Sequence, residues 1–401
     1  MLSVRHLKVL LATFVLLCSV FASWTDACSE TAEPQLIRVG PDREIKTPSG
    51  AAKVAVDGAI VEIDAGEYPR DAAVWRQNNL TLRGVGGRAH LRSEGASVEG
   101  KAIWVIKGNN TRVENIEFSG ARVEDRNGAG IRLQGNDLTV VGCSFHDNEN
   151  GILSGRHPES VIVVERSEFA NNGNGDGRTH NMYIGHAKSF TLKNSYVHHA
   201  KAGHNVKTRA TTNHILYNRI MDEDSGTSSY AIDLPEGGDA FVVGNSIQQG
   251  RHAQNSSLIN YSRKSNEQTG RLHVVHNTLV NDRRSGTFIQ NRSSSAARIV
   301  NNIFAGRGPV IAGTANMKGN LFVGASVADG GSGSGNQEAP EAGFVDRSTF
   351  NYRLTAGSAA IDRALARATG IAKFEYVHVA DGKPRAQVEA PDIGAFEFPG
   401  P

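Results

Sequence analysis

The chain is poor in cysteine, in net charge and in long apolar segments, and each shortage excludes a class of protein. Three cysteines in 401 residues cannot build a disulfide framework. A formal net charge of +2 lacks the basic excess of proteins that bind nucleic acid or anionic membranes. Beyond the first residues, no segment approaches 18 consecutive apolar residues. We therefore expect neither a nucleic-acid partner nor a membrane span.

The first residues, MLSVRHLKVLLATFVLLCSVFAS, have the pattern of a secretory signal. Arg5 and Lys8 precede the apolar run from Val9 to Phe21, and small residues follow it. Cleavage after Ala22 would leave 43 − 2 = 41 Lys and Arg against 41 Asp and Glu. The segment 1–22 thus predicts an exported protein, periplasmic or extracellular. Because the mature chain would be neutral, any positive site in it must be local.

One short motif recurs along the chain, a polar or small residue, any residue and then a large apolar one. Examples are GCSFHD, RSEFAN, KNSYVH, YNRIMD, GNSIQQ and HNTLVN. Counted from Cys143, successive motifs lie 24, 27, 24, 27, 32, 25 and 18 residues apart. Short alternating strands precede and follow each motif, and no helical pattern separates them. Units of about 25 residues built in this way predict the coils of a parallel β-helix.

In a β-helix, equivalent strands of successive coils lie about 4.8 Å apart, so inward side chains stack into ladders. We expect aliphatic, aromatic and asparagine ladders inside the stack. The motif places Cys143 where Asn194 and Asn218 stand in later coils. Cys143 is therefore expected to be buried and unpaired rather than bonded to Cys28.

A solenoid needs protected ends, because open strands invite association. After a signal at 1–22, the segment 23–60 is expected to hold a capping helix, with Pro48 in its first turn. The coils are predicted for 61–325. The segment 326–401 is predicted to hold a flexible Gly/Ser-rich loop and then a closing segment.

Four segments near the two ends carry a resemblance to a known group of proteins. VEIDAGEY, NLTLRGVGG, YRLTAGSAAID and PDIGAFEF resemble the start and finish of pectate-lyase-like right-handed parallel β-helix proteins. The likeness covers nearly the whole mature chain and implies an all-β, single-domain solenoid. That superfamily includes polysaccharide lyases, polygalacturonase-type hydrolases, uronate epimerases, esterases and phage tailspikes, so the reaction must be argued from the site.

Aligning the strands that follow each motif brings one polar cluster onto the outer face of the stack. Tyr183, Lys207 and Asp233 fall in one row, preceded by Arg132 and Leu153. The candidate substrate-binding residues of this groove are His180, Asn181, Tyr183, His204, Asn205, Tyr230 and Arg132. Each residue alone would more often be a solvated surface group. Their convergence on neighbouring coils favours a bound acidic sugar chain.

The composition of the groove bears on the reaction. Hydrolysis of a glycosidic bond usually needs two opposed carboxylic groups, and only Asp233 and Glu236 lie here. β-Elimination from a uronate instead needs neutralisation of its carboxylate, a base and an acid. The residues Lys207, Arg209, His180, His204, Tyr183 and Tyr230 suit those roles.

The resemblance adds a specific implication, because β-helix lyases such as pectate lyases and chondroitinase B use a groove Lys or Arg as base. By that likeness Lys207 is the predicted base, and Arg209 is predicted to bind carboxylate or assist the leaving group. Such a lysine must be neutral, which its cationic neighbours would favour. Ca²⁺ often assists these enzymes, and Asp233 and Glu236, with the acidic loop MDEDSG, are its expected ligands.

The leading hypothesis is therefore an exported, monomeric polysaccharide lyase acting on an acidic, uronate-containing polysaccharide. A C5-epimerase or a glycoside hydrolase using the same groove is the alternative within enzymes. The absence of an Asp-Pro-His-Asp motif counts modestly against the epimerase. A non-catalytic carbohydrate-binding β-helix is the third reading.

Overall fold

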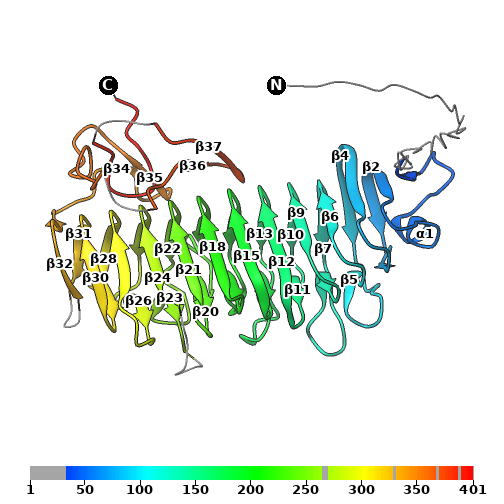
Figure 1. The fold of residues 1–401 in the computed structure, drawn as a ribbon, viewed down its shortest axis with the longest axis horizontal. Helices are drawn as coiled ribbons and strands as arrows, with labels where there is room; N and C mark the ends of the chain where they lie inside the picture. Colours follow the sequence, from blue (N-terminus) through cyan, green and yellow to red (C-terminus); the bar gives the residue numbers. More distant parts are fainter. Residues whose placement is uncertain (1–32, 264–269, 328–330, 367–369, 387–389, 401) are drawn as a thin grey trace, which may run out of the picture. The chain divides into compact units, whose positions relative to one another are not determined.

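The computed structural model describes residues 33–263, 270–327, 331–366, 370–386 and 390–400 (Figure 1). The predicted signal segment 1–22 and Cys28 lie outside these residues. Residues 34–401 make up one compact unit, which contains all the strands discussed below. Within the described part of the chain, no helix is long and apolar enough to cross a membrane.

Three lines of parallel strands wind around a common core, one strand of each line per coil, which confirms the predicted parallel β-helix. We call the three lines sheets 1, 2 and 3. Sheet 1 has the fewest strands and forms a separate hydrogen-bonded sheet. Sheets 2 and 3 are joined at their beginning, because the long strands β2 and β4 belong to both. Along the chain a coil passes from sheet 2 to sheet 3 and then to sheet 1, with tight turns between them.

The strands are assigned to the sheets as follows. Sheet 1 contains β3 (Ala73–Trp75), β5 (Ala102–Ile106), β8 (Ala129–Leu133), β11 (Asn150–Ser154), β14 (Met182–Ile184), β17 (Val206–Thr208), β20 (Ile232–Leu234), β23 (Ser257–Tyr261), β26 (Thr287–Asn291) and β29 (Ile311–Ala312). Sheet 2 contains β1 (Leu36–Val39), β2 (Ile60–Pro69), β4 (Thr81–Arg92), β6 (Thr111–Glu114), β9 (Leu138–Val141), β12 (His157–Glu165), β15 (Ala187–Lys193), β18 (Thr212–Leu216), β21 (Asp239–Val243), β24 (Leu272–Val275), β27 (Ala297–Val300), β30 (Ala315–Lys318) and β32 (Gly331–Ser334). Sheet 3 continues from β4 through β7 (Ile116–Ser119), β10 (Ser144–His146), β13 (Glu168–Ala170), β16 (Tyr196–His198), β19 (Arg219–Met221), β22 (Ser246–Gln249), β25 (Thr278–Asn281), β28 (Ile303–Pro309), β31 (Leu321–Ser326) and β33 (Gln337–Glu338).

The core is filled by ladders, because alternate side chains of each strand point inward and adjacent coils place them in register. Phe118, Phe145 and Phe169 of sheet 3 form an aromatic ladder with ring centroids 4.9 and 4.7 Å apart. Buried rows of Ile, Val and Leu, with further aromatic side chains such as Trp75 and Trp104, make up much of the remaining interior. The inward-facing residues of sheet 1 beside the outer row are all buried: Ile131, Ile152, Met182, Val206 and Ile232.

An asparagine ladder closes the turn between sheets 2 and 3, and it corrects one predicted register. Each member accepts the backbone N–H of the preceding coil, as Asn245 Oδ1 does from Asn218 N at 2.8 Å. Ser195, not Asn194, holds this position two coils after Cys143. Asn194 instead adopts a positive φ of 51° in the turn, which asparagine tolerates. Cys143 is buried and free, as predicted.

The N-terminal cap matches the prediction, as a helix of five residues, α1 (Pro48–Ala52). Thr47 caps it by accepting the Gly50 N–H at 3.2 Å, and Pro48 occupies the first turn. The helix buries Ala51 against the first coil.

The C-terminal segment departs from the prediction in two ways. Part of the stretch expected to be a loop forms β32, where a Cβ at Gly333 would lie 1.5 Å from Met317 O, so only glycine permits the pairing. The antiparallel pairs β34 (Phe344–Asp346) with β35 (Asn351–Leu354), and β36 (Phe374–Val377) with β37 (Asp381–Pro384), then pack along the outer face of sheet 3 (Figure 1).

Candidate functional site

The polar row predicted from sequence exists on the outer face of sheet 1. Tyr183 pairs with Lys207 and Lys207 with Asp233 across neighbouring strands β14, β17 and β20. Leu153 pairs with Tyr183 and, on its other side, with Arg132. Because parallel coils keep register, residues 21 to 30 apart in the sequence become immediate neighbours in this row.

Two stacked histidines border Lys207. The imidazoles of His180 and His204 lie with ring centroids 4.6 Å apart and only 8° between their planes. Nδ1 of His180 accepts the backbone N–H of His204 at 3.0 Å, and Nδ1 of His204 accepts that of Tyr230 at 3.3 Å. Both histidines are almost wholly buried. The repeat thus locks each ring to the backbone of the next coil.

The protonation of these rings follows from their contacts. Burial first, and then His204, Lys207 and Arg209, hold the pKa of His180 well below its usual value. Burial first, followed by Lys207 and Arg263, does the same to the pKa of His204. Both rings are therefore neutral near pH 7. Because Nδ1 is an acceptor in each, hydrogen-bond logic assigns the ring proton to Nε2.

The Nε2 atoms point at the two functional groups of the row. Nε2 of His180 lies 3.1 Å from Nζ of Lys207. Nε2 of His204 lies 3.3 Å from Oδ2 of Asp233. Nζ of Lys207 also sits over the ring of Tyr183, 4.8 Å from its centroid. An Nε2–H group can donate to a lysine nitrogen only when that amine is neutral.

Asp233 is a buried carboxyl group with one amide donor and nearby nitrogen groups. Asn260 donates to its Oδ1 at 2.5 Å, and Nη2 of Arg263 lies 3.7 Å from its Oδ2. Burial raises the pKa of Asp233, while Asn260 and the nearby basic side chains Lys207, Arg263 and Arg209 oppose that rise.

The predicted Ca²⁺ ligands do not fit a calcium site. Both oxygens of Glu236 are taken, one by Nη1 of Arg209 at 2.5 Å and the other by Nε2 of His186 at 2.6 Å. Asp233 faces Asn260 and His204 rather than an open oxygen cluster. Ca²⁺ needs six to eight oxygens, and here the two carboxylates face nitrogen donors and cations.

The acidic loop MDEDSG does not supply the missing oxygens. Asp222 is buried and accepts from Asn205 at 3.4 Å, Glu223 pairs with Arg219 at 3.0 Å, and Asp224 pairs with Arg251. The three carboxylates therefore serve separate contacts.

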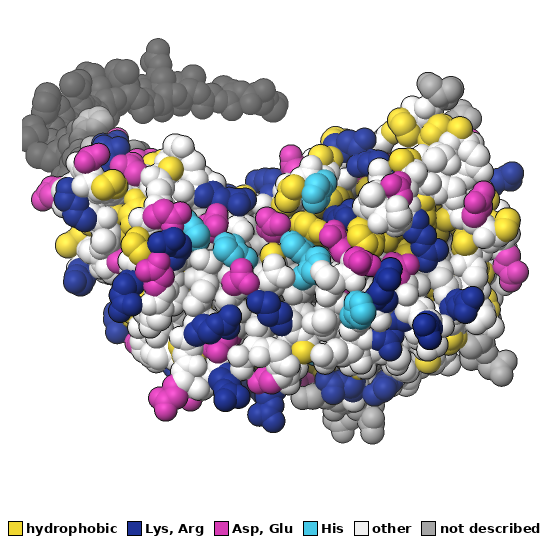
Figure 2. All heavy atoms as spheres, turned by 180° about the vertical axis from the view of Figure 1, so that it is seen from behind, with side chains coloured by type: hydrophobic (Ala, Val, Ile, Leu, Met, Phe, Trp, Pro, Cys, Tyr) yellow, Lys and Arg dark blue, Asp and Glu magenta, His cyan; other side chains and the backbone are white. Residues whose placement is uncertain are grey.

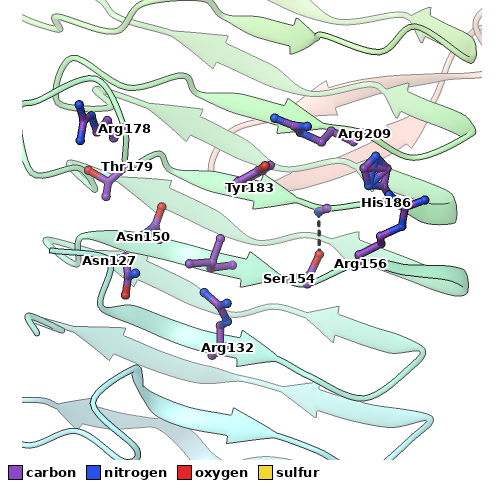
Figure 3. A pocket seen from close by; sticks show the side chains of 13 residues that line it. Asn127, Arg132, Asn150, Ser154, Arg156, Arg178, Thr179, Tyr183, His186 and Arg209 are labelled. Carbon is purple, nitrogen blue, oxygen red and sulfur yellow. Dashed lines mark hydrogen bonds between the residues drawn. The ribbon is translucent and has the colours of Figure 1, made fainter. Parts of the chain in front are cut away.

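A hollow of about 400 Å³ opens beside this row and is lined by arginines (Figure 3). Arg132 belongs to the row on β8, and Arg209 directly follows β17. Arg156 and Arg178 come from turns. In Figure 3, Arg178 lies at one side of the hollow and Arg209, Arg156 and His186 at the other, with Tyr183 between them. Tyr183 also stacks under Arg209, whose Cζ is 5.5 Å from the ring centroid.

Three of these arginines have no acidic partner in the described part of the chain: Arg132, Arg156 and Arg178. None of them forms an ion pair with a described carboxylate. Burial lowers the pKa of Arg132, and its Nε is buried without a hydrogen-bond partner. Uncompensated guanidinium groups around a hollow form a site for an anion, since they bind carboxylates bidentately.

Some predicted residues reach the groove, and others do not. Lys207, Arg209, Tyr183, His180, His204 and Arg132 come together as described, and Tyr230 lies against His204 with ring centroids 5.1 Å apart. Asn181 and Asn205 are fully buried, and Asn181 Nδ2 donates to Asn205 Oδ1 at 2.8 Å. They form an inner ladder that supports the turns, so we remove them from the substrate-facing set.

Sequence reasoning missed Arg156, Arg178 and His186, because they lie in or beside turns rather than at the aligned strand positions. A usable signal was present in the sequence. Both arginines sit a few residues before or after strands that carry the groove, in GRHPE and DGRTH. Arg263, which follows β23, also borders Asp233.

Comparisons with known proteins bear on the fold. No family model and no curated protein matches the chain. A solved structure described as pectate lyase Pel9A is similar over 90% of this chain and 96% of that one, with a TM-score of 0.59 and 15% sequence identity. A mutant pectin methylesterase in complex with a hexasaccharide is also matched, at 12% identity over 74% of this chain and 80% of that one. Its TM-score of 0.22 carries no argument. The chain therefore has the pectate-lyase-like parallel β-helix fold.

Proposed function

We propose that this protein is a polysaccharide lyase that cleaves a uronate-containing polymer by β-elimination, with Lys207 as the base. The contact between Nε2 of His180 and Nζ of Lys207, 3.1 Å long, carries the proposal. His180 Nδ1 is occupied by a backbone N–H, so the ring offers Nε2–H to the amine. That arrangement favours a neutral lysine with a lone pair, which is the form that can take a proton.

The reaction can be written with the groups of this row. Lys207 takes the proton on C5 of the uronate, and the electron pair forms the C4–C5 double bond as the C4–O bond breaks. The leaving oxygen then receives a proton from an acid in the groove, and Tyr183, whose ring lies under Nζ of Lys207, carries a hydroxyl suited to that role. Guanidinium groups stabilise the charge that develops on the uronate carboxylate in the transition state.

The hollow beside Lys207 supports an acidic polymer as substrate. Arg132, Arg156 and Arg178 have no described acidic partner there, so an anionic chain would supply their counter-charges. Arg209 is held by Glu236 at 2.5 Å and leans over Tyr183, so it is oriented before any substrate binds. Orientation of this kind reduces the entropy lost on binding. The signal-like sequence of residues 1–22 supports export, to the periplasm or beyond, where such polymers would be met.

A glycoside hydrolase is disfavoured by the carboxylates of the row. Asp233 is buried behind Asn260 and His204, and Glu236 is bound by Arg209 and His186. Neither is an open pair flanking a bond, as hydrolysis requires. A C5-epimerase shares the proton abstraction but returns a proton, so its product has no double bond.

The test uses ultraviolet absorbance, which rises when a 4,5-unsaturated uronate forms. The mature protein is mixed with pectate, alginate, glucuronan, glycosaminoglycans and bacterial exopolysaccharides, with calcium and with chelator. We expect a rise with one polymer that persists in chelator, because the row lacks an oxygen cluster for Ca²⁺. Since a base contributes about 10² to 10⁴ in rate, Lys207→Ala should lose at least a hundredfold in kcat.

Lys207→Ala removes both the amine and its charge, whereas Lys207→Arg keeps a cation, so polymer binding without turnover in Lys207→Arg would separate a base from a charge that merely binds substrate. The matched control is Lys188→Ala, an exposed lysine of β15 outside the groove. Full activity in Lys207→Ala would refute the assignment of the base. Proton exchange at C5 without an unsaturated product would indicate the epimerase, and retention of a polymer without turnover would indicate a binding protein.

A further inference from the structure

A second cluster of ionisable side chains lies on the outer face of sheet 3, away from the Lys207 row. His90 of β4, Glu117 of β7 and His146 of β10 come from three successive coils. Register places His90 beside Glu117, and His146 beside Ser119. Figure 2 shows histidines gathered with acidic side chains on one face of the unit, in the hollow before the C-terminal segment. The three side chains are 18, 24 and 31% exposed, so solvent reaches them.

His146 has an arrangement that a neutral imidazole cannot satisfy alone, whereas Nε2 of His90 also has the Ser119 hydroxyl as a partner at 2.7 Å. Nδ1 of His146 lies 3.1 Å from Oδ2 of Asp147, and its Nε2 lies 3.0 Å from Oε1 of Glu117. Nδ1 of His90 lies 3.1 Å from Oε1 of Glu67, and its Nε2 lies 3.4 Å from the same Glu117 oxygen. A neutral His146 ring has one proton for two carboxylates, so a second proton or a metal on its Nε2 side would complete these contacts.

We propose that His90, Glu117 and His146 bind a divalent transition metal, best Zn²⁺, through His90 Nε2, His146 Nε2 and Glu117 Oε1. Bonds of about 2.0–2.1 Å in a tetrahedral zinc site put ligand atoms about 3.3 Å apart. The observed separations from Glu117 Oε1 are 3.4 and 3.0 Å. Two imidazoles and one carboxylate suit zinc, whereas Ca²⁺ prefers oxygen ligands. The partial exposure leaves a fourth position for water or a ligand group.

The surrounding contacts resemble a second coordination shell. Metal-binding histidines usually donate their other N–H to a carboxylate, which orients the ring. Glu67 and Asp147 do this here, and each is itself held by a cation: Arg92 Nε lies 3.0 Å from Glu67, and Lys201 Nζ lies 3.0 Å from Asp147.

The metal would compete with protons and with one hydroxyl. The Oγ of Ser119 lies 2.7 Å from His90 Nε2 and would have to turn away. Metal binding also requires both imidazoles to be unprotonated at Nε2, so protons compete with the metal.

The experiment titrates tag-free, chelator-dialysed protein with Zn²⁺ by calorimetry, and with Co²⁺ by visible absorption, which reports tetrahedral coordination. We expect one Zn²⁺ per chain and a tetrahedral Co²⁺ band. Glu117→Gln and His146→Ala should each weaken binding at least tenfold. The control His214→Ala, whose ring stacks on Phe241 at 5.1 Å outside the cluster, should bind as the wild type does.

Two results would overturn the proposal: no stoichiometric binding by the folded wild type, or unchanged affinity in both cluster variants. Circular dichroism of each variant shows whether it has folded. If one cluster variant fails to fold, Ser119→Ala provides the second test, because removal of the competing hydroxyl should preserve or strengthen Zn²⁺ binding, and a loss of binding in that folded variant would contradict the site. The readouts need no turnover, so failure here is independent of the lyase proposal.

Discussion

Arg132 should lower the free energy of unfolding of the protein and raise its affinity for substrate. The variant Arg132→Met should therefore be more stable than the wild type and bind substrate more weakly. The Nε of Arg132 is buried without a hydrogen-bond partner, a state that costs about 1–3 kcal/mol. Methionine fills similar space without a charge, so we expect the free energy of unfolding to rise by about 1 kcal/mol. A hydrogen bond to a charged group contributes about 1.5–3 kcal/mol, so loss of a carboxylate contact at Arg132 should weaken oligouronate binding roughly 10- to 140-fold.

The binding assay is calorimetry with the oligouronate of the polymer that the absorbance panel identifies, in the Lys207→Ala background so that no turnover intervenes. Stability is measured by guanidinium unfolding of the same proteins. The control is Arg112→Met, an exposed arginine paired with Glu114 at 2.5 Å on another sheet. A folded Arg132→Met variant that is less stable than the wild type and binds the ligand equally well would refute the reasoning.

Two predictions concern the stability of the solenoid. In Asn277→Ala, the backbone N–H of the preceding coil loses its acceptor, and Val242 O loses its donor at 2.8 Å. The free energy of unfolding should therefore fall by about 3–5 kcal/mol. As the control, Asn316→Ala replaces an exposed asparagine and should leave the unfolding midpoint in the same guanidinium titration nearly unchanged. Equal midpoints for the two variants would contradict the ladder argument. Burial lowers the pKa of His276 to about 3, so the unfolded chain binds the proton first and stability falls as pH drops below about 6.5. We expect His276 alone to reduce the free energy of unfolding by about 2 kcal/mol between pH 8 and 5, and His276→Gln to have a correspondingly shallower pH profile. Parallel profiles for wild type and variant would exclude that contribution.

The outer row could be predicted from sequence because a β-helix converts spacing into contact. Once the repeat set the register, Tyr183, Lys207 and Asp233 had to become neighbours. The ladder position was predicted at Asn194, one residue before its true place at Ser195. The motif does not reveal that Asn194 adopts a positive φ in the turn. Asn181 and Asn205 were misplaced for a related reason: an asparagine beside a groove strand points inward or outward according to the turn that precedes it.

The contacts that decide chemistry were less accessible to sequence reasoning. Arg156 and Arg178 reach the hollow from turns, whose direction depends on how neighbouring coils pack. The pairing of Glu236 with Arg209 and His186 joins residues 27 and 50 positions apart and occupies the carboxylate that seemed free for Ca²⁺. Charge compensation of this kind is a property of distances in space, which a residue list does not contain.

The sequence by itself determined the solenoid, its interior ladders, the capping helix and the row that carries Lys207, because all of these follow from periodicity and strand alternation. Tertiary structure decided which side chains contact one another across coils. It turned His180 Nε2 toward Lys207, buried Asp233 behind Asn260, and joined His90, Glu117 and His146 on a different face. Periodicity specifies which residues stack, whereas side-chain direction and burial, which set protonation and metal binding, depend on the packed coils around them.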